Sequence, residues 1–192
     1  MDGYIFVLAL DGKLYNSDLN SVSSWTAGNF ISTNISTDSG VGCIKHKNYI
    51  AAFGTSSIEF FYNAGNPSGS PLSSAPQLFS NIGAYFNFIP VRSNDTVFFL
   101  SYSTSQLALY KLDGFQPVKI DSQGIIFSPA GATLQTPLSA IGYEGQQIIN
   151  IPGTNTGNYW YSVDNDIFVD PALTHGAIFS QLGYQVYGIL LD

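Results

Sequence analysis

The chain has 192 residues, of which 45% are hydrophobic and only 10% charged, and its 13 acidic and six basic residues give a formal net charge of −7. Because apolar residues are abundant and charged residues are few, the composition excludes an intrinsically disordered chain of high net charge. Six scattered Lys and Arg residues cannot build a strong phosphate-neutralising surface, and no apolar run approaches the roughly 20 residues of a membrane span. We therefore expect a folded chain without a membrane span and without strong DNA binding.

A hairpin pattern recurs four times along the chain: an apolar strand, a short turn, and a second strand rich in aromatics or Leu. The predicted hairpins cover residues 4–15, 49–62, 97–110 and 148–161. Their equivalent first-strand positions are separated by 45, 47 and 51 residues, and they are Ile5, Ile50, Val97 and Ile148. This spacing is close to the roughly 40–50 residues of a β-propeller blade.

Strand-like segments also precede the second, third and fourth hairpins, at residues 42–46, 85–89 and 138–143. Each repeat is therefore expected to hold three or four strands. No such segment precedes the first hairpin. Residues 184–192 look like the start of a further blade. Either the chain is a fragment, or this end supplies the strand that the first blade lacks and closes the ring.

The first strand of each hairpin is apolar on both faces, as in Tyr4–Leu10. Such a strand needs cover on both sides, which blades packed face to face provide and an immunoglobulin-like sandwich with one wet face does not. The predicted fold is all-β, a β-propeller-like array of about four blades, with an incomplete ring as one alternative. We expect one domain, 1–192, with approximate blades 1–40, 41–84, 85–135 and 136–192.

Local signals refine this prediction. Asp11-Gly12 lies between two apolar strands, where a two-residue turn would need positive φ at both positions. Asn63–Pro76, rich in Ser, Pro, Gly and Asn, indicates a surface loop or a linker between blades. No segment favours a helix.

Metal ligands are not convincingly grouped. Asp164-Asn165-Asp166 with Asp170 offers oxygen atoms but lacks the glycine and the distal glutamate of a calcium loop, so a turn is favoured. His46 and His175 lie 129 residues apart with no cysteine pair to complete a zinc site. We expect no metal and no cofactor.

Catalytic groups are equally sparse. Cys43 lies in an apolar stretch and is expected to be a small buried residue, because a cysteine nucleophile needs a positioned base. Lys45-His46-Lys47 is expected to be the solvated end of a strand. Glu59 and Glu144 are the two glutamates; paired carboxylates serve glycosidases, but isolated glutamates on strands usually face solvent. No catalytic, cofactor-binding or metal-binding residue is predicted, and the chain is not expected to be an enzyme.

Exposed aromatics could form a sugar-binding platform, with Trp25 and Trp160 as candidates. A tryptophan beside apolar strand residues is more often part of the core. The core position is therefore the favoured interpretation for both.

Several segments, in order along residues 2–165, resemble the packaged-DNA stabilisation proteins, or tail hub proteins, of short-tailed phages. The segments are Asp2–Phe6, Leu14–Asn20, Ser24-Trp25, Phe53-Gly54, Ser57–Glu59, Tyr62–Gly65, Val97–Leu100 and Tyr110–Pro117. They carry strand and turn positions, so no functional residue is transferred with them.

The resemblance implies a structural virion protein in a phage tail, a hub or head-to-tail connector that helps retain and conduct packaged DNA. The implied partners are other tail and connector proteins in a ring-shaped homo-oligomer, with DNA only as passing cargo and assembly in the host cytoplasm. The alternative is a carbohydrate-binding or glycan-hydrolysing propeller, which would show glycan affinity and carboxylates clustered near the axis.

Overall fold

The computed structural model describes residues 1–86, 88–103, 106–121, 136–143, 145–152, 159–169, 178–182 and 185–189. Within these residues the chain forms strands β1 to β19 and one short 3-10 turn, η1 (Pro76–Leu78), with no α-helix. Four antiparallel sheets follow one another in chain order, and each is a meander in which neighbouring strands are consecutive in sequence. The predicted all-β class is confirmed.

The first sheet has three strands and the other three sheets have four each. The first sheet contains β1 (Phe6–Leu8), β2 (Lys13–Asn16) and β3 (Phe30–Ser32). The second contains β4 (Gly40–His46), β5 (Tyr49–Gly54), β6 (Ile58–Asn63) and β7 (Leu72–Ser74). The third contains β9 (Val91–Ser93), β10 (Thr96–Ser103), β11 (Gln106–Asp113) and β12 (Gln116–Lys119). The fourth contains β14 (Ser139–Tyr143), β15 (Gln146–Ile151), β16 (Tyr159–Ser162) and β17 (Ile167–Val169).

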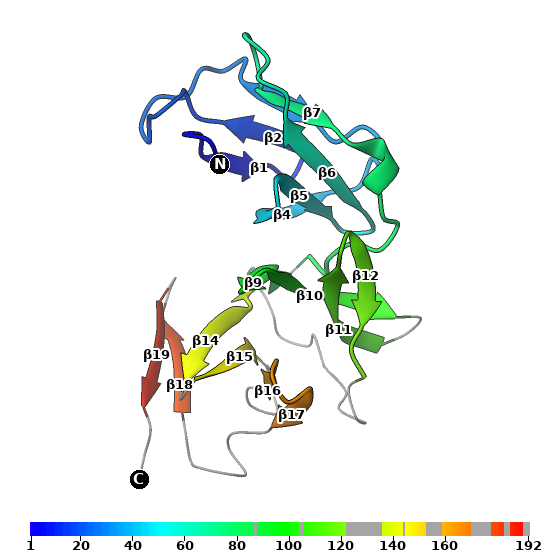
Figure 1. Cartoon of the computed structure of the whole chain (residues 1–192), viewed down its shortest axis with the longest axis vertical. Helices are drawn as coiled ribbons and strands as arrows, with labels where there is room; N and C mark the ends of the chain where they lie inside the picture. Colours follow the sequence, from blue (N-terminus) through cyan, green and yellow to red (C-terminus); the bar gives the residue numbers. More distant parts are fainter. Residues whose placement is uncertain are drawn as a thin grey trace.

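Two smaller strand pairs complete the described chain. β8 (Phe88–Ile89) pairs in parallel with β13 (Thr136–Pro137), and β18 (Ile178–Leu182) pairs with β19 (Gln185–Ile189) as an antiparallel hairpin. In Figure 1 the four sheets follow one another around an arc, with β1 near one end and the β18–β19 hairpin near the other. The sheets do not close into a ring.

All four predicted hairpins are present as paired strands, β1–β2, β5–β6, β10–β11 and β15–β16. Preceding strands occur as predicted before the second and fourth hairpins, at β4 and β14. Before the third hairpin the prediction is wrong: the strand that joins the sheet is β9, whereas residues 85–89 contribute only β8, which pairs with β13. The predicted loop over Asn63–Pro76 also contains an outer strand, β7, which pairs with β6.

Consecutive sheets pack face to face, and each pair of sheets shares one apolar core. Leu14, Ile50 and Phe61 lie in the core between the first and second sheets. Phe53, Phe60, Phe99 and Tyr110 lie between the second and third, and Phe98, Leu100, Ile149 and Tyr161 between the third and fourth. Because side chains alternate along a strand, Phe98 and Phe99 of β10 enter different cores.

Burial on both faces is confirmed for β5, β10 and β15, where the apolar residues are buried regardless of the face they lie on. For β1 the prediction is wrong. Phe6 and Leu8 pack toward the second sheet, but Val7 is 50% exposed. The reason is that in the described chain no sheet lies on the outer face of the first one.

The Asp11-Gly12 turn differs from the predicted two-residue type. Only Gly12 has a positive φ, of 78°, and its N–H donates to the Ala9 carbonyl at 3.1 Å. The Ala9 N–H in turn donates to the Lys13 carbonyl at 2.9 Å, so three residues form the loop. This is the three-residue hairpin in which a type I turn ends on a left-handed residue, and glycine has no Cβ penalty there.

We predict that Phe99→Ala lowers the free energy of unfolding by about 3–5 kcal/mol, the usual cost of deleting a fully buried phenylalanine ring. The Phe99 ring lies 5.1 Å from Phe53 and 5.6 Å from Tyr110, centroid to centroid, so its loss leaves a cavity between two sheets. Urea unfolding measures the change. Val118→Ala, at a 39% exposed position of β12, is the control, and an equal loss in both variants would contradict the packing described here.

Candidate functional site

The connection from the first sheet to the second is held by a buried carboxylate. Glu59 of β6 is 2% exposed. Its carboxylate oxygens accept backbone N–H groups of Asn34 at 3.3 Å, Ile35 at 3.0 Å and Ser36 at 3.2 Å. The expectation that Glu59 faces solvent is therefore wrong, because three amides of a neighbouring segment replace water around the charge.

Asp38, at the end of the same connection, binds the turn between β5 and β6. Its carboxylate accepts the Ser56 N–H at 2.6 Å, the Ser56 hydroxyl at 2.9 Å and the Ser57 hydroxyl at 3.0 Å. Burial alone would raise the pKa of Asp38, but these hydrogen bonds outweigh it and hold the pKa below its ordinary value. Two carboxylates thus fix residues 34–38 onto the second sheet.

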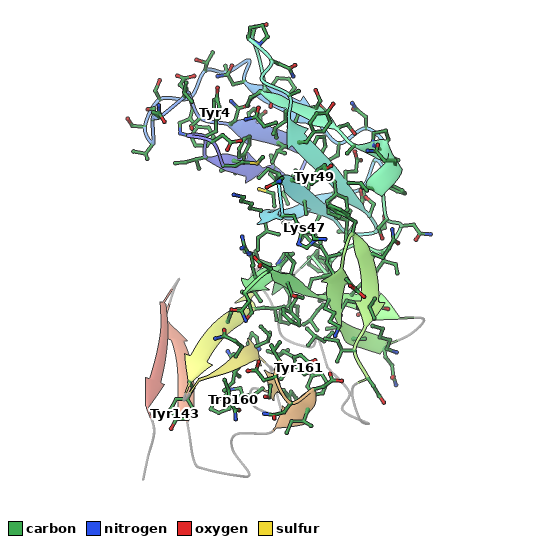
Figure 2. The ribbon with its side chains drawn as sticks, in the orientation of Figure 1. Tyr4, Lys47, Tyr49, Tyr143, Trp160 and Tyr161 are labelled. Atoms are coloured by element: carbon green, nitrogen blue, oxygen red, sulfur yellow. The ribbon has the colours of Figure 1, made fainter. Side chains whose placement is uncertain are left out.

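The joint between the second and third sheets is aromatic. Phe115 lies in the turn between β11 and β12. Its ring makes edge-to-face contacts with the rings of His46, Tyr49 and Phe60, at centroid distances of 5.6, 5.1 and 5.2 Å. The Lys47 ammonium lies 5.0 Å from the centre of the same ring. Figure 2 shows Lys47 on the side of the second sheet that faces the third.

His46 is 1% exposed, so the predicted solvated strand end is wrong for this residue and right for its neighbours Lys45 and Lys47, which are exposed. Its Nε2 lies 2.5 Å from the Gly114 carbonyl oxygen and therefore carries a proton that it donates there. Its Nδ1 is buried with no hydrogen-bond partner. Burial lowers the pKa of His46, and Lys47 and Arg92 act in the same direction.

An aromatic hollow of about 470 Å³ lies between the β5–β6 turn, residues 81–86 and the end of β10. The Tyr85 and Tyr102 rings meet edge to face at 5.2 Å, and Phe86 and Tyr102 are 54% and 50% exposed. No charged side chain lines the hollow. It is a neutral, amphipathic surface of the kind that is enriched in protein–protein interfaces.

Cys43 of β4 is partly buried against the core of the first two sheets, and burial raises the pKa of its thiol to about 11. A thiol that stays protonated is a poor nucleophile. The surroundings of Cys43 therefore favour a packing residue and not a nucleophile.

The two tryptophans lie in different sheets and share no platform. Trp25 is 40% exposed in the loop between β2 and β3, so the core prediction is wrong for it. Trp160 lies in β16 of the fourth sheet and is partly buried, as seen in the lower part of Figure 2.

Asp164, Asn165 and Asp166 form the predicted turn, here between β16 and β17. The Asp164 carboxylate accepts the Gln147 N–H at 2.7 Å, and that of Asp166 accepts the Tyr161 hydroxyl at 2.5 Å. Burial, followed by the Asp166 carboxylate, raises the pKa of Tyr161. The carboxylate oxygens of Asp164 and Asp166 therefore accept hydrogen bonds from other groups of the protein.

Glu144, Asp170 and His175 lie outside the described residues. In the part of the chain that the structure describes, no three His, Cys, Asp or Glu side chains gather as a metal site would require. The same part contains no helix of the length and apolarity that a membrane span needs. The described residues form contacts between neighbouring sheets and exposed aromatic surfaces.

A family model described as "Bacteriophage P22 Gp10, beta-propeller" matches residues 1–127 of the 192, which include the first three sheets. The chain belongs to this family. Its resemblance to phage stabilisation proteins is thereby confirmed, and the protein is a structural component of a phage virion with a β-propeller-type fold. Among curated proteins, none matches the chain.

Sequence reasoning missed Asp38 and misjudged Glu59. Glu59 lies between Ile58 and Phe60-Phe61, an apolar setting that favours a buried acid, but its amide partners lie 23 to 25 residues earlier in the chain. For Asp38 no local pattern exists, because its serine partners lie 18 and 19 residues further along the chain.

We predict that Glu59→Gln lowers the free energy of unfolding by about 1–3 kcal/mol, because three backbone amides lose the carboxylate that accepts their hydrogen bonds. Urea unfolding of the purified protein measures it. Asp95→Asn is the matched control, since the Asp95 side chain is 95% exposed and its ion pair contributes at most about 1 kcal/mol. A Glu59→Gln variant as stable as the wild type would show that the joint does not depend on the charge.

We predict that acidification from about pH 7.5 to about pH 5.5, across the usual histidine pKa near 6.5, destabilises the protein through His46. With its pKa lowered by burial, folded His46 binds fewer protons than unfolded His46, so stability falls as the pH falls below about 6.5. Urea unfolding at both pH values should show a smaller loss in His46→Gln. His175 is common to both proteins, so an unchanged loss in the variant would exclude His46 as the cause.

Proposed function

We propose that the chain is part of a phage tail hub or head-to-tail connector that helps to retain and conduct packaged DNA. The observation that carries this proposal is the family match over residues 1–127. The four sheets are proposed as successive blades of one domain, 1–192. On this proposal the protein acts by assembly in the virion tail, after synthesis in the host cytoplasm, and not as an enzyme.

Exposed apolar side chains support assembly with other proteins. The first sheet and its loops expose Val7, Leu10, Leu19, Val22 and Trp25 at 50, 70, 58, 78 and 40%. A second exposed group lines the hollow around Tyr102. Clusters of this kind mark contact surfaces in soluble proteins. We propose that they contact other tail and connector proteins, or further copies of this chain in a ring.

The charge distribution supports DNA as passing cargo and not as a tightly bound ligand. Of the six basic residues, Lys13 pairs with Asp11 and Arg92 with Asp95, both at 2.9 Å. Lys47 lies over Phe115. A net charge of −7 repels a polyanion, and a conduit that holds phosphates loosely lets the duplex slide.

We predict that the purified protein does not shift duplex DNA at sub-micromolar concentration in about 0.15 M salt. A gel-shift titration measures this. The same titration at about 0.01 M salt is the control, because screening is weaker there and any residual attraction would be strongest. A shift at the higher salt concentration would contradict loose passage of DNA.

The same proposal predicts that phage particles assembled without this protein lose their packaged DNA, because its place at the tail is left open. DNA per particle and infectivity are the measurements, with particles complemented by the wild-type chain as the control. Particles that keep their DNA and infect normally without the protein would overturn the proposed function.

A further inference from the structure

The aromatic hollow between the second and third sheets has walls that are fixed by backbone hydrogen bonds. One wall is formed by residues 81–86, in the connection between the two sheets. The Ala84 N–H donates to the Gly54 carbonyl of the second sheet at 2.8 Å, and the Tyr85 N–H donates to the Leu100 carbonyl of the third sheet at 2.7 Å. A ligand therefore meets a wall that is already in place, which lowers the entropic cost of binding.

Gly83 brings this connection into direct contact with the β5–β6 turn. A Cβ atom at this position would overlap the Gly54 carbonyl oxygen and the amide nitrogens of Ser56 and Ser57. The turn itself is held by the Asp38 carboxylate, which accepts the N–H and the hydroxyl of Ser56. The turn and the connection, which together bound the hollow, are thus fixed relative to each other.

Three aromatic rings line the hollow. The Tyr85 ring lies 4.9 Å from the Phe86 ring and meets the Tyr102 ring edge to face at 5.2 Å, centroid to centroid. Tyr85 is partly buried, whereas Phe86 and Tyr102 are 54% and 50% exposed. The hollow therefore presents aromatic surface that a ligand can cover.

Hydroxyl and amide groups line the hollow beside these rings. Thr55 and Ser56 are exposed in the β5–β6 turn, and Asn81 is exposed at the start of the connection. The Ser56 hydroxyl donates to Asp38, which leaves its oxygen able to accept a further hydrogen bond. The Asn81 amide can both donate and accept. Every side chain that the structure describes in this lining is neutral.

This combination of groups selects a class of ligand. A purely apolar ligand would displace water from the hydroxyl and amide groups without replacing its hydrogen bonds. A neutral sugar matches both kinds of surface, because its ring presents C–H groups on one face and hydroxyl groups around its edge. The face of an aromatic ring is electron-rich and attracts such C–H groups. The volume of the hollow, about 470 Å³, lies within the range of small-molecule sites.

We propose that the hollow binds a neutral sugar unit of an oligosaccharide or polysaccharide. Phe86 and Tyr102 cover the face of the sugar ring, and Ser56 and Asn81 bond its hydroxyl groups. This proposal goes beyond the proposed virion function and does not depend on it. A saccharide and a protein contact around Tyr102 exclude each other at any one time, so a protein ligand is the competing outcome of the test.

The test is a glycan array probed with the full chain. The array carries neutral oligosaccharides of glucose, galactose, mannose and N-acetylglucosamine beside oligosaccharides that contain uronic or sialic acid. We expect binding to neutral members. The neutral oligosaccharide bound best is then titrated in solution, where Phe86→Ala and Tyr102→Ala should each bind about tenfold more weakly than the wild type, as expected for loss of an aromatic contact.

Trp25→Ala is the matched control. It removes a ring that is 40% exposed in the loop between β2 and β3, away from the hollow, and should bind like the wild type. Phe86 and Tyr102 are about half exposed, so both variants should keep wild-type stability in urea. They are tested separately, so a folding defect in one leaves the other decisive.

Three results would count against the sugar site. A wild-type chain that binds no neutral oligosaccharide, or binds only the acidic ones, overturns the proposal. Wild-type affinity in both ring variants shows that the saccharide binds elsewhere. Self-association that is lost in Phe86→Ala and Tyr102→Ala, measured by sedimentation velocity in a chain that binds no saccharide, assigns the hollow to a contact between copies instead.

Discussion

The structure depends on burial of the sheets on both faces. A strand such as β10, with Phe98 and Phe99 in two different cores, is stable only when a sheet lies on each side of it. A sheet with this sequence and only one neighbour would expose one row of large apolar side chains to water, at about 25 cal/mol for each Å². Stacking is therefore a requirement of the sequence, and any sheet without a neighbour remains an open interface.

The polar contacts follow from the stacking. Once two sheets lie face to face, the segment that connects them crosses from the outer strand of one to the first strand of the next. At the first joint Glu59 accepts backbone amides of this segment, and Asp38 accepts hydrogen bonds from the facing turn. At the second joint the β4–β5 turn meets Phe115 with His46, Tyr49 and Lys47. Glu59, His46 and Lys47, which sequence inspection considers among the catalytic groups, are instead used to hold one sheet against the next.

A structural role in a virion is consistent with this arrangement. The acidic groups that could have formed a catalytic pair or a metal site in the described chain are bound to backbone or hydroxyl donors of the protein itself. The aromatic groups that are not used in the cores are exposed, around Tyr102 and on the outer face of the first sheet. Such a molecule presents surfaces for other proteins.

The sequence by itself determined the strands, the hairpins and the repeat, since these depend on local apolar patterning and turn residues that recur about every 48 residues. It also carried the family resemblance, because that resides in the same strand and turn positions. The tertiary structure decided the environment of single residues: Glu59 buried, Trp25 exposed, β9 in place of residues 85–89, and Val7 without cover. Each of these depends on which segment packs against which, over separations of 18 residues or more in the case of Asp38 and its partners. Local sequence specifies that both faces of a strand are apolar, but only the packed molecule shows which of the two faces is covered by another sheet.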